Sequence, residues 1–247
     1  MTTHKPIKHS AQFRFFNELN DFLPQKFKNT EFKYQFINKP SIKDTIQAIG
    51  IPHIEVDLII VNGKSIDFEY LMIGGEKIQI YPKNTKLKGI HLQPKYPTSN
   101  KFIVDVNLGK LVPKLRLLGF DTLYQNDYKD HKIVEVSNKE NRIILTGDIG
   151  ILKYNAVKFG YWVRNTKPHL QVEEVIRRFN LKLLIKAFTR CSSCNGNLMV
   201  VPKGSIVHIL PQKTQEQFSD FTQCESCQKV YWQGSHVDKI LKWIANL

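Results

Sequence analysis

The sequence predicts two architectures in one chain: a small mixed α+β domain, and then a mainly parallel α/β domain followed by a cysteine-rich ribbon. Three observations predict this. Residues 10–84 have the order strand, strand, helix, hairpin, strand. After residue 100, apolar strands alternate with helical segments, which is the pattern of a parallel sheet. All four cysteines fall in two C-x-x-C pairs further along the chain.

The first domain is predicted over residues 10–84. Ser41 is the expected N-cap of its helix, Gly50 the stop, and Asn62-Gly63 a two-residue hairpin turn. The predicted elements are strands at 11–19 and 32–37, a helix at 41–49, a hairpin of 58–61 with 64–66, and a strand at 77–81.

This order is that of a β-grasp, and the segment resembles the ubiquitin-like domains that include sulfur carriers. Such carriers end in a flexible Gly-Gly whose carboxylate is activated. Here Gly74-Gly75 precedes the final strand and the chain continues past Pro82, so carrier chemistry is disfavoured. The domain is interpreted as a binding or positioning module and is a candidate surface for a protein partner.

A linker is predicted over residues 85–100, which are polar and rich in turn-forming residues. Pro113 disfavours the interior of the first helix that follows, so this helix starts late or kinks. The α/β domain is expected over residues 101–188, with the ribbon and a terminal helix over 189–247. The predicted elements are strands at 101–105, 121–124, 142–146 and 161–164, and helices at 108–118, from Asp130 to 136, and at 149–159.

Two carboxylates, Asp105 and Asp148, fall at the carboxyl ends of predicted parallel strands, where open α/β sheets bind their ligands. Carboxylates that meet there repel one another unless a hard divalent cation such as Mg²⁺ or Mn²⁺ neutralises them. Such a metal activates water against a phosphodiester. Asp130 is a third candidate ligand, with Asp127 as its substitute. Aspartate is also common at strand ends and helix N-caps, so a purely structural role stays open, above all for Asp130.

The same region contains the stretches FIVDVNLGKL at 102–111, LRLLGFDT at 115–122, ILTGD at 144–148, FTRC at 188–191 and YWQGSH at 231–236. With these stretches it resembles, over about residues 101–240, the PIN-like ribonuclease domain first described at the C-terminus of the Mut-seven exonuclease. The resemblance implies acidic residues around one or two divalent ions, with Asp105, Asp130 and Asp148 in those positions. A β-grasp domain commonly precedes the bacterial members. The family often has Thr-Arg-Asp where this chain has Thr146-Gly147-Asp148, and usually lacks a proline at 113.

The cysteine pairs predict a structural zinc site. Four thiolates suit tetrahedral zinc, and each C-x-x-C turn directs two sulfurs to the ion. A disulfide would need an oxidising compartment, for which no targeting signal is present, and a redox site would need one pair only. A closed zinc ribbon is therefore expected over about residues 189–235. The ligands are Cys191, Cys194, Cys224 and Cys227.

The composition excludes a disordered basic tail, because 42% of the 247 residues are hydrophobic and 11% are aromatic. No apolar run approaches the roughly 20 residues that a bilayer span needs. No apolar stretch follows the charges of residues 1–9, so a cytoplasmic protein without membrane contact is expected.

The net charge of +14 is unevenly distributed: residues 1–85 hold 11 Lys and Arg against 9 Asp and Glu, and residues 86–247 hold 25 against 13. The excess reflects either a lysine-rich proteome or a nucleic-acid partner. The candidate RNA contacts are Lys110, Lys114, Arg116 and Arg164.

Any one of these basic residues is more often a solvated surface charge. Tyr231 and Trp232 either stack RNA bases or form the small core of the ribbon. Together with the acidic residues, the basic surface predicts a metal-dependent ribonuclease with structural zinc and catalytic Mg²⁺ or Mn²⁺. The alternative is a non-catalytic module that binds RNA or a ribonucleoprotein through its basic surface and zinc ribbon.

Overall fold

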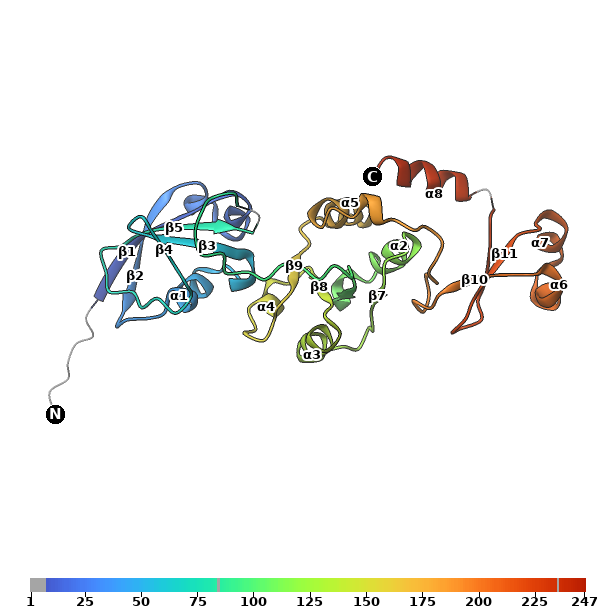
Figure 1. Cartoon of the computed structure of the whole chain (residues 1–247), viewed down its shortest axis with the longest axis horizontal. Helices are drawn as coiled ribbons and strands as arrows, with labels where there is room; N and C mark the ends of the chain where they lie inside the picture. Colours follow the sequence, from blue (N-terminus) through green and yellow to red (C-terminus); the bar gives the residue numbers. More distant parts are fainter. Residues whose placement is uncertain (1–7, 84, 235) are drawn as a thin grey trace. The chain divides into compact units, whose positions relative to one another are not determined.

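The computed structural model describes residues 8–83, 85–234 and 236–247, so the predicted domain boundary at Asn84 lies outside the described residues. The chain divides into two compact units (Figure 1). One comprises Met1–Tyr96 with Asp148–Tyr161, and the other comprises Pro97–Gly147 with Trp162–Leu247. No helix in the described ranges combines the length and the apolar character needed to cross a membrane.

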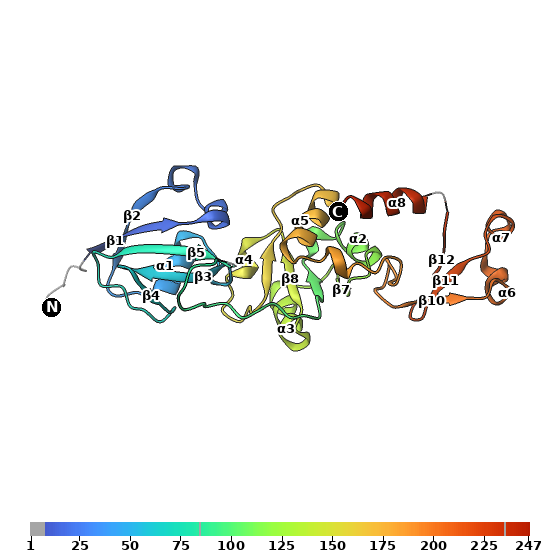
Figure 2. The ribbon, with the colours of Figure 1, turned by 45° about the horizontal axis from the view of Figure 1, so that its top comes forward.

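A five-stranded mixed sheet forms the first unit and confirms the β-grasp prediction (Figure 2). Its order is β2-β1-β5-β3-β4, with β1 and β5 parallel. Helix α1 (Ile42–Ile49) buries Ile42 and Ile46 in a core that includes Phe13 and Phe15 of the sheet. The strands are β1 (Lys8–Phe15), β2 (Glu31–Ile37), β3 (Val56–Val61), β4 (Lys64–Ile66) and β5 (Lys77–Pro82).

Local sequence signals explain most of these boundaries. The Ser41 hydroxyl accepts the Asp44 N–H at 3.0 Å and caps α1, and Gly50 ends it at φ +123°. The strand predicted at 11–19 is too long, because β1 stops at Phe15. The chain turns at Asn17 (φ +49°) into a 3-10 helix, Asn17–Phe22.

Part of the predicted linker is fastened to β3. Asp57 Oδ1 accepts the Gln93 N–H at 3.0 Å, and Asp57 Oδ2 lies 2.8 Å from His91 Nδ1. The Gln93 side-chain amide donates to the carbonyls of His53 and Val56 at 2.8 and 2.7 Å. Residues 91–93 therefore extend the first unit and are not a free tether.

The helix predicted at 149–159 is much shorter in the structure. Helix α4 (Ile149–Leu152) ends at Lys153, and a turn in which the Val157 N–H donates to the Tyr154 carbonyl replaces the rest. This turn buries Val157 and leads into β9 (Gly160–Trp162). The segment belongs to the first unit although it follows Pro97–Gly147, which belong to the second unit.

The predicted parallel sheet is confirmed, with the order β7-β6-β8-β9 and with β6 parallel to both β7 and β8. Helices α3 (Asp130–Glu140) and α5 (Pro168–Arg178) lie on opposite sides of it (Figures 1 and 2). Lys129, and not Asp130, occupies the N-cap position of α3. The remaining elements are β6 (Phe102–Val104), β7 (Thr122–Leu123), β8 (Ile143–Thr146) and α2 (Val112–Leu117), which starts late with Pro113 in its first turn.

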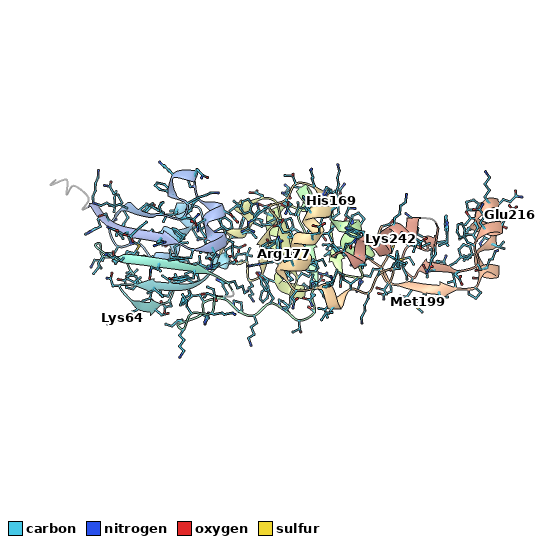
Figure 3. The ribbon with its side chains drawn as sticks, turned by 90° about the horizontal axis from the view of Figure 1, so that it is seen from above. Lys64, His169, Arg177, Met199, Glu216 and Lys242 are labelled. Carbon is cyan, nitrogen blue, oxygen red and sulfur yellow. The ribbon has the colours of Figure 1, made fainter. Side chains whose placement is uncertain are left out.

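Three antiparallel strands form the ribbon around a small core of Ile206, Leu210 and Phe221. Figure 3 labels Met199 on β10 and Glu216 on α7, both of which are exposed. The elements are β10 (Leu198–Val201), α6 (Lys203–Ile206), α7 (Gln212–Gln217), β11 (Phe221–Cys224), β12 (Val230–Trp232) and the following helix α8 (His236–Ala245).

Acid should destabilise the first unit through His53. Burial, together with the charge of Lys43, lowers the pKa of His53 from 6.5 to about 4. Above pH 6.5 both the folded and the unfolded states are neutral at this site. Between pH 6.5 and 4 only the unfolded chain binds the proton, so the free energy of unfolding falls with the pH, by roughly 3 kcal/mol at most.

Hydrogen exchange of the β3 and β5 amides from pH 7 to 4, corrected for intrinsic exchange rates, measures this loss. His53→Gln cannot take up the proton and should show a flatter pH dependence. Identical pH profiles for the two proteins would contradict the prediction.

Candidate functional site

Asp105 lies directly after β6 and is only 4% exposed. Its Oδ1 accepts the Val106 N–H at 2.6 Å, and its Oδ2 accepts the Thr146 hydroxyl at 2.6 Å and the Asn107 side-chain amide at 2.7 Å. A carboxylate offers about four lone-pair sites. Three hydrogen bonds thus hold Asp105 in one orientation and leave it with capacity for one further ligand.

Asn107 completes a bridge between the carboxyl ends of β6 and β8. While its amide nitrogen donates to Asp105, its Oδ1 accepts the Gly147 N–H at 3.0 Å. Neither Asn107 nor Thr146 is among the site residues predicted from the sequence. A signal was present for Thr146, which is the one polar residue of an otherwise apolar strand, Ile143–Thr146.

The other two predicted acids stand at helix starts. Asp148 is exposed and caps α4, with its Oδ1 accepting the Gly150 N–H at 2.8 Å. Asp130 is half-buried in the first turn of α3, where a negative charge is favourable. Within the described residues, the four cysteines form the only group of three or more potential ligands whose atoms all lie within 4.8 Å of one another. The catalytic assignment of Asp105, Asp130 and Asp148 therefore stays a prediction.

Three of the predicted RNA contacts remain at least partly accessible. Lys110 is exposed and lines a hollow of about 460 Å³ together with Asn107 and Gln171. Lys114 Nζ lies 5.7 Å from the centre of the Trp243 ring. The guanidinium of Arg164 lies 4.9 Å from the centre of the Trp162 ring. On α5, His169 and Arg177 add an exposed basic face (Figure 3).

Arg116, the fourth predicted contact, has a structural position. It is 5% exposed, and its Nε donates to the Thr122 carbonyl at 2.9 Å. Its Nη1 donates to the carbonyls of Ser192 and Ser193 at 3.3 and 2.6 Å. These two serines lie between Cys191 and Cys194, so Arg116 fixes the first cysteine turn against the α/β domain and is not available for RNA.

Asp121 makes a second connection to that turn. Its Oδ1 accepts both Arg142 Nη1 at 2.7 Å and the Asn195 amide at 2.8 Å. Burial alone raises the pKa of Asp121, but the hydrogen bonds from Arg142 and Asn195 outweigh burial and hold this pKa below its usual value. Asp121 is the first residue of the strand predicted at 121–124. The structure shows that it joins the parallel sheet to the ribbon.

The four cysteines converge as predicted. Cys191 Sγ lies 3.6 Å from Cys227 Sγ, and Cys194 Sγ lies 3.4 Å from Cys224 Sγ. Each pair is followed by a residue with positive φ, Asn195 at +74° or Gln228 at +59°. The positive φ reverses the chain direction after each pair. The four sulfur atoms are those of a closed tetrahedral metal site.

Two thiols of this cluster differ in acidity. Burial raises the pKa of Cys191, but hydrogen bonds from Tyr231 and from the Cys194 and Ser193 backbone outweigh it, so the pKa falls to about 6. Desolvation and hydrogen bonds with the neighbouring thiols raise the pKa of Cys194 to about 12. The contrast therefore follows from the different hydrogen bonds of the two sulfurs.

Two family models match the chain. One, described as Mut7-C RNAse domain, matches residues 100–244, and the other, described as Mut7-C ubiquitin, matches residues 8–88. No curated protein and no solved structure matches significantly. The first match covers more than half of the chain, and its range contains both the parallel sheet and the cysteine cluster. The chain therefore belongs to the Mut7-C RNAse domain family and carries a Mut7-C ubiquitin domain before it.

Proposed function

We propose that this protein is a metal-dependent ribonuclease whose acidic site is built around Asp105. The observation that carries the proposal is the fixed carboxylate at the carboxyl end of β6, held by Thr146 from β8, in a chain of the Mut7-C RNAse domain family. This is the sheet edge at which open α/β folds bind ligands. Burying a carboxylate costs free energy, so the three donors that orient it are consistent with a functional demand on its position.

Asp105, Asp130 and Asp148 would hold Mg²⁺ or Mn²⁺. Mg²⁺ usually keeps several waters and takes only one or two carboxylates from the protein, so it does not need a tight cage of side chains. The one free lone-pair site of Asp105 suits such a hydrated ion. When bound, the ion would supply a more acidic water and stabilise the charge that develops on the phosphodiester.

The chain's own residues would bind and orient the RNA strand. Lys110 lines the hollow beside Asn107, next to the Asp105 carboxylate, where it can neutralise a phosphate. Lys114 and Arg164 would contribute further phosphate contacts. The zinc ribbon would present Tyr231 and Trp232, of which Trp232 is 39% exposed.

Cys191, Cys194, Cys224 and Cys227 would hold a structural zinc ion. Their mutual distances fit one ion, and the ribbon core alone is small. A zinc site of four thiolates is typical of a reducing compartment, where disulfides are rare. We therefore expect the protein to act in the cytoplasm.

A second function is supported by one observation. The three acids do not form a close ligand group of the kind that the cysteines form within the described part of the chain. A protein with a silent acidic site would be a non-catalytic RNA or ribonucleoprotein binding module that uses the same basic surface and ribbon.

The acidic site is tested by incubating labelled single-stranded RNA with the protein and Mn²⁺ or Mg²⁺. Asp105→Asn and Asp148→Asn should lower the cleavage rate by about 100-fold or more, because the metal contributes several kcal/mol to the transition state. Asp238→Asn on α8 is the matched control and should cleave like the wild type. Equal cleavage by all four proteins would refute the assignment, and RNA binding without cleavage would favour the second function.

Removing zinc should unfold the ribbon. Elemental analysis should find about one zinc per chain, and a strong chelator or Cys224→Ser should make the amides of β10 and β11 exchange rapidly, because metal binding supplies the folding free energy of such a small module. Ser226→Ala, between Cys224 and Cys227, is the control and should retain zinc. A metal-free protein with a protected ribbon would contradict this prediction.

Lys110→Ala should weaken RNA binding without changing the fold. If Lys110 contacts one phosphate, the slope of log K against log salt for single-stranded RNA should become shallower by about 0.7. Lys139→Ala, an exposed lysine on α3, serves as the control. The two variants would have equal salt slopes if the hollow beside Asp105 does not bind RNA.

A further inference from the structure

We propose that the ubiquitin-like domain acts on its own chain: it supports residues 148–161 and thereby positions the carboxylate of Asp148. The catalytic consequence depends on the ribonuclease function proposed above, whereas the docking does not. The starting observation is that residues 148–161 form one compact unit with the ubiquitin-like domain.

The segment needs an external support because its helix is very short. Helix α4 has four residues, and a single helical turn is not stable by itself. Its order must come from packing, and Ile151 and Leu152 are fully buried. Since Asp148 is the N-cap of α4, whatever holds this helix also holds the backbone that carries the Asp148 carboxylate.

The ubiquitin-like domain and the segment approach each other closely at Gly160. A Cβ atom at this position would lie 3.0 Å from Ile54 Cδ1 of the ubiquitin-like domain and 2.7 Å from Leu152 Cδ2 of α4. Both distances are shorter than ordinary van der Waals contact. The backbone at Gly160 therefore lies close to both side chains, and a Cβ here would have to displace their methyl ends. Ile54 is itself 4% exposed.

Two further contacts flank this point. The rings of Tyr96 and Phe159 lie 6.3 Å apart, and Lys83 Nζ lies 3.5 Å from the centre of the Tyr96 ring. The buried His53 ring is also close enough to the Val157 backbone for this backbone to affect the pKa of His53. The segment is thus contacted by an aliphatic and a polar group of the domain, Ile54 and His53. An aromatic group, Tyr96, contacts it from the residues that follow the domain in the same compact unit.

These contacts give the domain a role other than that of a carrier. Its Gly74-Gly75 pair forms an internal turn in which the Gly75 N–H donates to the Ser10 carbonyl at 2.7 Å. The face that contacts residues 148–161 is occupied by the chain itself. The partner of this surface is therefore the segment that begins at Asp148.

The test uses the full-length protein and has two readouts. Ile54→Ala and the milder Tyr96→Leu should speed hydrogen exchange of the amides of residues 149–160 by about tenfold, and leave those of α3 unchanged. The turnover number for RNA should fall while KM stays constant, because a mispositioned Asp148 affects the reacting state and not RNA binding. The conservative variant Ile54→Val should retain most of the exchange protection of residues 149–160 and most of the turnover number. Ile37→Ala, at an exposed position of β2, is the matched control.

The outcomes separate the two proposals. Unchanged exchange in residues 149–160, with β1 and β5 still protected, would overturn the support role. Faster exchange with an unchanged turnover number would overturn the positioning of Asp148 and leave the ribonuclease function intact. If the wild type cleaves no RNA, the ribonuclease proposal fails, and the exchange measurement still decides whether the domain supports the segment.

Discussion

The hydrogen bond from the Thr146 hydroxyl to the Asp105 carboxylate is the interaction on which the candidate site depends. Both residues are buried, and each stands at the carboxyl end of its strand. Without this donor, a carboxylate that is 4% exposed would lose one of three compensating hydrogen bonds in a region of low dielectric. Because the bond joins Thr146 of β8 to Asp105 after β6, the orientation of the carboxylate depends on the register in which these two strands pair.

Hydrogen bonds of buried or half-buried polar side chains connect the ribbon to the same domain. Arg116 donates to carbonyls within the first cysteine turn, and Asp121 accepts from Asn195 of that turn. The buried guanidinium of Arg116 thus holds the first cysteine turn and is satisfied by acceptors within it. The positive charge that remains accessible lies on more exposed residues, such as Lys110.

Patterns that arise from local chemistry were predictable from the sequence. Ser41, Asn62-Gly63 and Pro113 each act through their immediate neighbours, and the elements they control lie where they were predicted. The spacing of the cysteines likewise predicted their convergence. The features that could not be predicted depend on which residues tertiary packing buries. The periodicity of residues 149–159 indicates a helix, but Val157 is buried by a turn, and nothing in the local sequence of Arg116 distinguishes a buried guanidinium from a surface one.

The N-terminal unit is discontinuous in sequence, since it comprises Met1–Tyr96 and Asp148–Tyr161. During synthesis the ubiquitin-like domain emerges from the ribosome first, but the residues that cover Ile54 follow only after some 50 further residues of the nuclease domain. Until then an apolar part of its surface faces solvent, and its last contacts must wait for a long-range closure. The order of translation therefore couples completion of the first domain to synthesis of the strands that carry Asp105 and Thr146.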